Sequence, residues 1–410
     1  AQDDRPVYHF SNPVGWMNDP NGFSDYKGEH HLFFQYYPYA THWDSMHWGH
    51  AKSTDFIKWE YLPTALAPDQ DYDNSGVFSG SAIEDGEKQI LIYTGVEEKA
   101  APNGEKCIRQ NQCVAIGNGV EYEKIENNPV VTADMLPEGS SLEDFRDPKV
   151  WKENGKYYMV AGSRHSDGSG QIALFCAEKP EKWEFAGILD RSENKIGRMW
   201  ECPDYFEVDG TKILSASVQG LEGGIWDDRN VYQSGYFLVD GDILEDYKLS
   251  EYQLWDYGFD YYAPQSFETE DGRRIHISWM GMPDCEEYTN PTIAEGWQHC
   301  FTFPREVFVE DGKVCQRPVR ELQKKKTLVD KSAGMLKKDG YKVYDVNISG
   351  IQNNEFRTVI DEELILEYKN GRFEMHFTSQ DKNSVSAGRG MRYIALDSVT
   401  DVEILVDHSS

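Results

Sequence analysis

The chain has 410 residues and a formal net charge of −30, with 71 Asp and Glu against 41 Lys and Arg. This acidity repels nucleic acid and anionic membrane surfaces, so we expect neither as a partner. No run of 18 apolar residues occurs, which excludes a membrane-spanning helix. The length favours two domains, and the 11 Trp and 24 Tyr favour many short strands and a neutral ligand that stacks on aromatic rings.

The seven cysteines, an odd number, include no Cys-x-x-Cys pair, so neither a disulfide framework nor a zinc site is predicted. Reduced thiols in a cytoplasmic protein are the expectation. Residues 1–5 hold no apolar leader, and a secreted chain whose leader was removed is the alternative. We expect no cofactor and no metal; His47 and His50 are interpreted as core residues, because no acidic partner pattern accompanies them.

The first motif is Trp16-Met17-Asn18-Asp19-Pro20-Asn21-Gly22. Pro20 fixes its own φ and pushes Asp19 toward an extended conformation, and Asn21-Gly22 supplies turn chemistry. A carboxylate on such a rigid turn, beside a Trp and amide donors, suits a sugar better than a metal. Alone, the motif would be an ordinary Asx-turn, but related turns recur along the chain.

Five hairpin turns recur along the first three quarters of the sequence. Each precedes a short β-rich segment: Lys27-Gly28 before His30–Gln35, Asp85-Gly86 before Gln89–Tyr93, Asn154-Gly155 before Lys156–Val160, Asp209-Gly210 before Lys212–Ala216, and Asp271-Gly272 before Arg274–Trp279. The turn glycines are spaced by roughly 60 residues. Five such repeats in an all-β chain predict a five-bladed β-propeller.

A distinctive residue or motif precedes each turn at a similar offset: Asp19, Ser79-Gly80-Ser81, Asp147, Glu201 and Tyr262-Ala263-Pro264. Equivalent positions of successive blades surround one axis, so these residues should meet at one mouth of the central channel. Three carboxylates from three blades would then face one another, and an active site is predicted at that mouth.

The character of the sequence changes after Val309. We expect a propeller over residues 1–316, a connector over 317–328 whose lysine triplet is a solvated face, and a β-sandwich module over 329–410. The strands predicted in this module are Tyr341–Ile348, Thr358–Tyr368, Arg372–Thr378, Met391–Leu396 and Val402–Val406. About 80 residues are few for two packed sheets, so the module is expected to be incomplete, with an open edge through which a homo-oligomer could form.

Taken together, these motifs resemble the β-fructofuranosidases of glycoside hydrolase family 32, which include invertases, sucrose-6-phosphate hydrolases, inulinases and levanases. The resemblance is carried, in order, by Trp16–Gly22, Gln35, Trp43, Met46–His50, Phe78–Ser81, Phe145–Pro148, Trp200–Pro203, Tyr262–Gln265, Gly296–Gln298 and Phe303–Glu306. It implies a five-bladed propeller followed by a β-sandwich, in agreement with the repeat. The family's sandwich continues for several more strands than this chain provides.

The resemblance also implies roles for the matching residues. Asp19 would be the nucleophile that attacks the anomeric carbon of a fructosyl unit, and Glu201 the acid/base of a retaining, two-step reaction. Asp147, beside Arg146, would bind fructose hydroxyls and stabilise the oxocarbenium-like transition state. Asp19 must then be ionised, helped by donors such as Asn18, while Glu201 must hold a proton near neutral pH.

Further residues are expected to bind the sugar, because a furanose needs hydroxyl partners and an apolar wall: Asn18, Gln35, Trp43, Phe78, Ser79, Arg146 and Trp279. The alternative for Gln35 and Ser79 is a strand polar group satisfied within the protein. The alternative for Trp43 and Trp279 is a place in the core. Cys202 is interpreted as a packing neighbour of Glu201.

Sucrose is the expected substrate, because residues 295–301 resemble the bacterial, intracellular sucrose-hydrolysing branch. Sucrose 6-phosphate and the fructans inulin and levan are the alternatives within this class. Two further alternatives are a non-catalytic carbohydrate-binding propeller, disfavoured because all three carboxylates are present, and an arabinan-specific propeller glycosidase, disfavoured because such enzymes lack the motif around Asp19.

Overall fold

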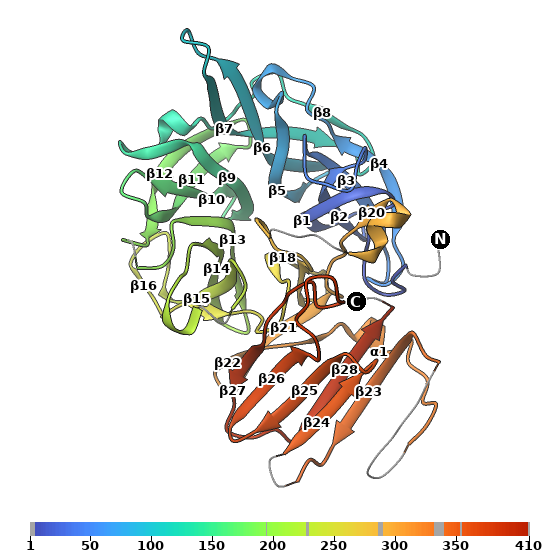
Figure 1. Cartoon of the computed structure of the whole chain (residues 1–410). Coiled ribbons are helices and arrows are strands. Elements are labelled where there is room, and N and C mark those ends of the chain that lie inside the picture. Colours follow the sequence, from blue (N-terminus) through green and yellow to red (C-terminus); the bar gives the residue numbers. More distant parts are fainter. Residues whose placement is uncertain are drawn as a thin grey trace.

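The computed structural model describes residues 5–193, 195–226, 229–285, 290–331, 340–352 and 355–408. Strands dominate these residues, so the all-β prediction is confirmed. A ring of sheets comes first, and two further sheets from the C-terminal part lie beside it (Figure 1). Within the described ranges, no helix has the length and apolar character needed to cross a membrane.

The ring contains five sheets, which follow one another along the chain. The first contains β1 (Gly15–Tyr26), β2 (Glu29–Tyr37), β3 (His47–Ser53), β4 (Glu60–Leu66) and β20 (Trp297–Gln298). The second contains β5 (Gly76–Asp85), β6 (Lys88–Ala100), β7 (Lys106–Gly117) and β8 (Tyr122–Lys124). The third contains β9 (Ser140–Glu153), β10 (Lys156–His165), β11 (Gly170–Lys179) and β12 (Lys182–Arg191).

The fourth sheet contains β13 (Met199–Val208), β14 (Thr211–Gln219), β15 (Gln233–Gly241), β16 (Tyr247–Leu249) and β17 (Gln253–Leu254). The fifth contains β18 (Tyr262–Glu268), β19 (Arg274–Trp279), β21 (Arg305–Glu310) and β22 (Lys313–Pro318). Short 3₁₀ helices at Asp71–Asp73, Ala133–Met135, Gly224–Trp226 and Pro291–Glu295 interrupt the connections.

The first strands of the five sheets form the inner wall of the ring. β1 packs against β5, β5 against β9, β9 against β13, β13 against β18, and β18 returns to β1. β20 closes the ring by pairing in parallel with β1, so that Gly15 faces Trp297 and Trp16 faces Gln298. Residues near both ends of the propeller sequence therefore share one sheet.

The predicted hairpins are confirmed, since each of the five turns joins the first and second strands of its sheet. In the first, Tyr26 pairs with Glu29 around Lys27 and Gly28, whose φ angles are 49° and 77°. Two consecutive positive φ angles match the right-handed twist of the flanking strands, and glycine adopts them without steric cost.

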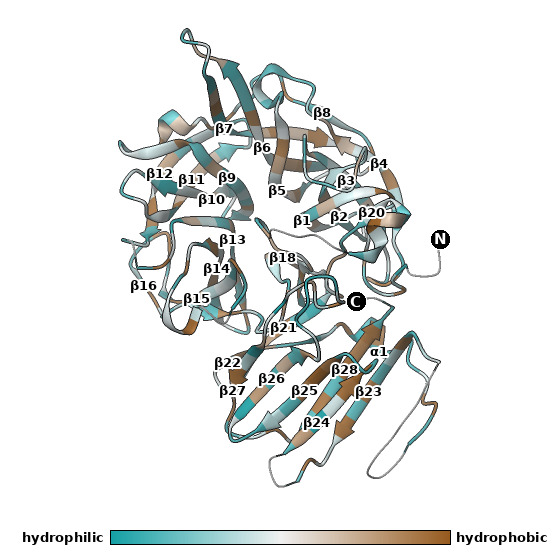
Figure 2. Ribbon diagram, viewed as in Figure 1, coloured by the Kyte–Doolittle hydropathy of each residue, from teal (hydrophilic) through white to brown (hydrophobic). Residues whose placement is uncertain are grey.

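Apolar side chains fill the spaces between neighbouring sheets. Trp48 and Trp200 are fully buried in two of these clusters, and Trp279 is 2% exposed in a third. Figure 2 shows the matching pattern, with hydrophobic segments on the strands and hydrophilic residues on many connecting loops. This packing makes the inner strands a rigid frame for their side chains.

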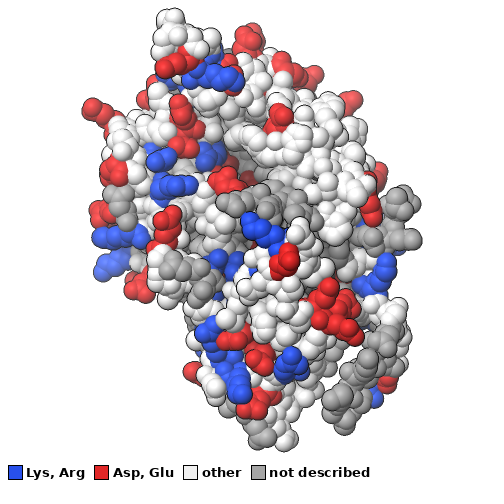
Figure 3. Space-filling view, in the orientation of Figure 1, with Lys and Arg blue, Asp and Glu red and all other residues white. Residues whose placement is uncertain are grey.

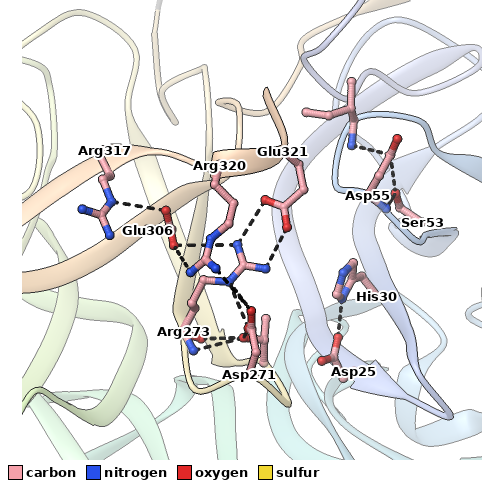
Figure 4. Close-up of polar contacts among 12 residues, drawn as sticks. Asp25, His30, Ser53, Asp55, Asp271, Arg273, Glu306, Arg317, Arg320 and Glu321 are labelled. Carbon is pink, nitrogen blue, oxygen red and sulfur yellow. Dashed lines mark hydrogen bonds and ion pairs between the residues drawn. The ribbon is translucent and has the colours of Figure 1, made fainter. Parts of the chain in front are cut away.

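An ion-pair network anchors the chain where it leaves the fifth sheet (Figure 4). Glu306, 4% exposed, lies 3.2 Å from the guanidinium groups of both Arg317 and Arg320. Arg273 lies 2.7 Å from Glu321, which belongs to α1 (Arg320–Gln323). The first part of the predicted 317–328 connector is thus fixed to the propeller.

The C-terminal module consists of two antiparallel sheets. One pairs β23 (Val343–Ser349) with β28 (Asp401–Asp407), and the other orders β24 (Phe356–Ile360), β25 (Leu364–Lys369), β26 (Arg372–Phe377) and β27 (Arg392–Ala395). The single strand predicted over Thr358–Tyr368 is wrong, because β24 and β25 are separate. Asp361 and Glu362, with φ of 51° and 62°, form the turn between them, and no glycine signals it in the sequence.

Asp407 joins this module to the start of the chain. Its fully buried carboxylate accepts hydrogen bonds from the backbone N–H groups of Val7 (2.7 Å), Tyr8 (2.8 Å) and His9 (3.0 Å). The Nδ1 atom of His9 lies 3.0 Å from the same carboxylate. Buried carboxylates require such partners, so the contact fixes β28 against the propeller.

Candidate active site

Each of the five inner strands departs from regular pairing at the position predicted to face the channel. The register shifts between Met17 and Pro20 in β1, between Phe78 and Gly80 in β5, between Arg146 and Lys149 in β9, between Glu201 and Asp204 in β13, and between Tyr262 and Gln265 in β18. Bulges of this kind re-aim side chains and are common beside active sites.

Proline explains why four of these bulges form where they do. Pro148, Pro203 and Pro264 each lie inside a register shift, where the absent N–H removes no ladder bond, and Pro20 ends the shift of β1, where it pairs with Phe34. The residue that precedes three of them has a positive φ: 65° at Asp147, 46° at Cys202 and 53° at Ala263. The sequence pattern therefore sets the backbone that presents the site.

Asp19, in the β1 bulge, receives hydrogen bonds from two predicted sugar-binding residues. The Oγ atom of Ser79 donates to Oδ2 over 2.6 Å, and Nδ2 of Asn18 donates to Oδ1 over 3.2 Å. Trp16 in turn holds Asn18, because its Nε1 atom donates to Oδ1 of Asn18 over 3.0 Å. Both carboxylate oxygens of Asp19 are thus oriented by neighbours.

Cys202 links Asp19 to Asp147. Its Sγ atom lies 3.5 Å from Oδ2 of each carboxylate, and its backbone N–H donates to Oδ2 of Asp147 over 2.9 Å. The backbone N–H of Asp147 donates to Oγ1 of Thr94 over 3.0 Å, which fixes the strained turn. Asp19 and Asp147, from the first and third sheets, therefore meet across a residue of the fourth.

Glu201 is held by three donors from three different sheets. Nε and Nη2 of Arg146 both lie 2.9 Å from Oε1, Nε2 of Gln219 donates to Oε2 over 2.8 Å, and the Tyr262 hydroxyl donates to Oε2 over 2.5 Å. Burial lowers the pKa of Arg146, but the charges of Glu201, Asp147 and Asp144 outweigh it and raise that pKa. The guanidinium therefore remains charged.

Burial raises the pKa of both aspartates. Burial raises the pKa of Asp19 to about 6; the Glu201 charge acts in the same direction, and the Ser79 and Asn18 hydrogen bonds oppose it. Burial and then Glu201 raise the pKa of Asp147 to about 7, against the effect of Arg146. The hydrogen bonds expected to keep Asp19 charged do lower its pKa, but burial raises that pKa by more.

The same cluster has the spacing of a candidate metal site. Ligand atoms of Asp19, Asp147 and Cys202 lie within 4.8 Å of one another. Burial, followed by the charges of the two aspartates, raises the pKa of the Cys202 thiol well above its ordinary value. A thiol that keeps its proton is a poor nucleophile, and Cys202 contacts the two carboxylates as a hydrogen-bond donor. Of the two histidines interpreted as core residues, His50 is 1% exposed and hydrogen-bonded to His31. His47 is half-buried, with its Nδ1 atom 2.9 Å from the Ser45 carbonyl oxygen.

The remaining predicted sugar-binding residues differ in how far they are buried. Trp43 is 51% exposed and contacts Phe78 edge-on, with ring centroids 5.8 Å apart, so a place for Trp43 in the core is excluded. Gln35 is 2% exposed and donates to Asn21 and to the Val77 carbonyl, as the alternative for this residue required.

Trp279 is also buried. It is 2% exposed and packs edge-on against Trp16, with ring centroids 6.1 Å apart. Trp16 donates to Asn18, and Asn18 donates to Asp19, so Trp279 supports the turn that carries Asp19. A contact of Trp279 with the sugar stays a prediction.

Two residues that hold Glu201 had no predicted role. Tyr262 belongs to a motif of the repeat, but its hydroxyl could not be assigned to a partner on another sheet. Gln219 ends β14 and lies opposite Met199, two residues from Glu201 along β13. Only the observed hairpin register identifies Gln219 as a partner.

Comparison with known proteins places this geometry in a family. The model of the glycosyl hydrolases family 32 N-terminal domain matches residues 9–318. A sucrose-6-phosphate hydrolase of Zymomonas mobilis is 41% identical over 330 residues, which cover 78% of this chain and 62% of that protein. A raffinose invertase of Escherichia coli is 42% identical over 320 residues, covering 78% of this chain and 65% of the invertase. The chain thus spans less than two thirds of the length of these relatives.

Solved structures extend the similarity to the C-terminal module. The sucrose-6-phosphate hydrolase of Lactobacillus gasseri superposes with a TM-score of 0.86 at 30% identity, over 99% of this chain and 84% of that one. A Bombyx mori β-fructofuranosidase mutant in complex with sucrose superposes with a TM-score of 0.80 at 31% identity, over 100% of this chain and 86% of that one. The predicted architecture of a propeller followed by a β-sandwich is thereby confirmed, and the chain belongs to glycosyl hydrolases family 32.

Proposed function

We propose that the protein is a retaining β-fructofuranosidase that releases terminal β-D-fructofuranosyl units, with sucrose as its main substrate. The observation that carries this proposal is the meeting of Asp19, Asp147 and Glu201 from three inner strands, each held by donors from neighbouring sheets. The relatives named sucrose-6-phosphate hydrolase and raffinose invertase support the substrate class.

In the first step, an oxygen of Asp19 attacks C2 of the fructosyl unit, and the bond from C2 to the glycosidic oxygen breaks. Glu201 gives its proton to the departing oxygen, so the leaving sugar departs as a neutral alcohol. In the second step, Glu201 takes a proton from water, whose oxygen attacks C2 and releases the carboxylate of Asp19. The donors to Asp19 orient one oxygen for attack, and those to Glu201 restrict its carboxyl to one plane.

Asp147 and Arg146 have supporting roles in this scheme. Asp147 accepts hydrogen bonds from fructose hydroxyls and stabilises positive charge that develops on the ring. Arg146 fixes Glu201 and compensates the charge of the carboxylates around it. Trp43 and Phe78 at the rim supply the apolar wall, and Asn18 and Ser79 complete the pocket.

Sucrose 6-phosphate and the fructans inulin and levan are alternative substrates within the same scheme. The proposed setting is the cytoplasm, which agrees with an odd number of cysteines and no Cys-x-x-Cys pair. Self-association through the C-terminal module, with neither nucleic acid nor membrane as a partner, completes the proposal.

The test is an assay of sucrose, sucrose 6-phosphate, inulin and levan with the wild-type chain and with Asp19→Asn. The substitution keeps the shape of the side chain but removes its nucleophilic oxygen, so fructose release should fall to background while the melting temperature stays near that of the wild type. If Asp19→Asn kept half of the wild-type turnover, the nucleophile assignment would be wrong.

A further inference from the structure

A polar residue directly follows the proline or glycine at the bulge of each inner strand. These residues are Asn21 in β1, Ser81 in β5, Lys149 in β9, Asp204 in β13 and Gln265 in β18. Four of them are buried, and Gln265 is half-buried. We call this set the polar belt. Buried polar groups must find partners within the protein, so the contacts of the belt show what it does.

Two members of the belt join inner strands through hydrogen bonds to the backbone. The Oγ atom of Ser81 donates to the carbonyl of Pro148 over 2.8 Å and accepts from the N–H of Val150 over 2.9 Å, which ties β5 to β9. The Nε2 atom of Gln265 donates to the carbonyl of Gly80 over 3.0 Å, which ties β18 to β5. The belt thus connects strands of different sheets directly beside their bulges.

Lys149 and Asp204 form an ion pair at which three sheets meet. The Nζ atom of Lys149 lies 3.3 Å from Oδ1 of Asp204 and donates to the carbonyl of Ser266 over 2.5 Å. The Oδ2 atom of Asp204 accepts from the backbone N–H and from the hydroxyl of Ser266, over 2.8 Å and 2.7 Å. The third, fourth and fifth sheets are therefore joined through one pair of charges.

This pair lies where regular strand pairing resumes beside two of the carboxylates. Lys149 and Asp204 are each the first paired residue beyond the register shift of their strand. Lys149 is two residues from Asp147, and Asp204 is three residues from Glu201. Residues inside a bulge lack ladder bonds, so their position depends on the paired residues that flank them. A contact between Lys149 and Asp204 therefore sets the spacing of the segments that carry the two carboxylates.

Both charges of the pair are buried. Lys149 is 8% exposed and Asp204 is 2% exposed, whereas many charged side chains lie on the surface, where both signs are interspersed (Figure 3). Burial lowers the pKa of Lys149, the charge of Asp204 raises it, and the charge of Arg274 lowers it. A buried ion pair gives little net stability over a well-packed apolar pair, because the desolvation of two ions offsets their attraction. The contribution of this pair is therefore expected in geometry.

We propose that Lys149 and Asp204 are positioning residues, whose ion pair holds Glu201 at the place from which it protonates the leaving oxygen. Neither residue touches the substrate in this scheme; both act through the strand segments beside them. The inference rests on the proposed β-fructofuranosidase activity and adds to it a device that keeps the acid/base in register with Asp147 on the neighbouring sheet.

The test compares kcat/KM for sucrose and for p-nitrophenyl β-D-fructofuranoside in the wild type and in Lys149→Met/Asp204→Asn. The double variant should melt closer to the wild type than Lys149→Met does, because the single variant leaves Asp204 buried without its partner. Its kcat/KM for sucrose should fall about 10-fold or more, since a displacement of about 1 Å can cost about 10²-fold. The loss should be smaller for the aryl fructoside, whose leaving group needs little protonation by Glu201.

Asp204→Asn alone is a milder variant. Its amide oxygen can still accept from Ser266, but the charge that holds Lys149 is gone. This variant should show the same selective loss on sucrose, and it tests the inference if the double variant does not fold.

The pair of Lys124 and Asp73 in the second blade supplies a matched control. The Nζ atom of Lys124 lies 2.5 Å from Oδ2 of Asp73, whose side chain is fully buried. Lys124→Met/Asp73→Asn should alter the melting temperature but leave the ratio of kcat/KM for the two substrates as in the wild type.

Three results would overturn the inference: a folded double variant with wild-type kcat/KM for sucrose, equal losses on both substrates, or the same selective loss in the control. If the wild type cleaved neither substrate, the proposed function itself would fail. Cleavage of both substrates with a ratio independent of Lys149 and Asp204 would refute the positioning role alone.

Discussion

Replacing Ser79 with Ala should move the acidic limb of the pH profile without removing any of the three carboxylates. Ser79 donates to Asp19 over 2.6 Å, and this hydrogen bond is the largest effect that lowers the pKa of Asp19 against burial. A hydrogen bond to a charged group contributes about 1.5–3 kcal/mol, and each pH unit corresponds to about 1.4 kcal/mol. In the proposed mechanism Asp19 must be charged, so activity should be lost as the pH falls through its pKa of about 6. Ser79→Ala should raise that limb by about one to two pH units.

The assay is kcat/KM for sucrose between pH 4 and pH 9, because this ratio reports the ionisation of the free enzyme. At pH 5 the variant should be about 10-fold or more below the wild type, and the two profiles should approach each other at alkaline pH. Asp19 and Asp147 titrate as a coupled pair, so the limb belongs to the pair. Ser53→Ala is a matched control, because it removes a serine–aspartate contact at Asp55, away from the site (Figure 4). A uniform loss at every pH, with the limb unmoved, would refute the argument and leave Ser79 as a contact of the sugar alone.

Two further predictions follow from the carboxylates. Glu201→Ala should lower kcat/KM for sucrose by about 10²–10⁴-fold. It should spare an aryl fructoside, whose leaving group needs little protonation, and azide should partly restore turnover. Equal losses on both substrates, without rescue by azide, would contradict the acid/base role. Asp407→Asn should lower the free energy of unfolding by about 1–3 kcal/mol at neutral pH, because it weakens hydrogen bonds to a buried charge. Burial opposes the ionised form of Asp407, but the bonds from His9, Val7 and Tyr8 lower its pKa below the ordinary value, so the stabilisation is present above that value and is lost as the pH falls. Melting temperatures of wild type and Asp407→Asn should therefore converge in acid, and a constant difference would exclude this role of the charge.

The ring of sheets and its three carboxylates could be predicted because each rests on local chemistry. The X-Gly turns have positive φ angles, which determine the hairpins. The pairs Asp19-Pro20, Asp147-Pro148 and Cys202-Pro203 lie at the bulges. Once equivalent hairpins surround an axis, residues at one offset must converge. The turn at Asp361-Glu362 contains no glycine, so a single strand was predicted where two strands form.

What could not be predicted depends on contacts between sheets and on burial. The bonds from Gln219 and Tyr262 to Glu201 join positions 18 and 61 residues away, and no local pattern encodes them. The donors to Asp19 could be inferred from neighbouring residues, but the burial that outweighs them arises only when five sheets pack together. The exposure of Trp43 and the burial of Trp279 beside Trp16 likewise depend on the assembled ring.

The parallel pairing of β1 with β20 affects how the protein can be made. A ribosome releases Gly15 and Trp16 almost 300 residues before their partners Trp297 and Gln298, so the strand that carries Asp19 waits with one edge unpaired while the other sheets emerge. Contacts this distant in sequence form late, because the loop between them must be ordered first. A nascent chain should therefore complete the sheet that carries Asp19 only when residues 297 and 298 leave the exit tunnel. Until then, a chaperone that covers β1 would protect the growing polypeptide from pairing with its neighbours on the same polysome.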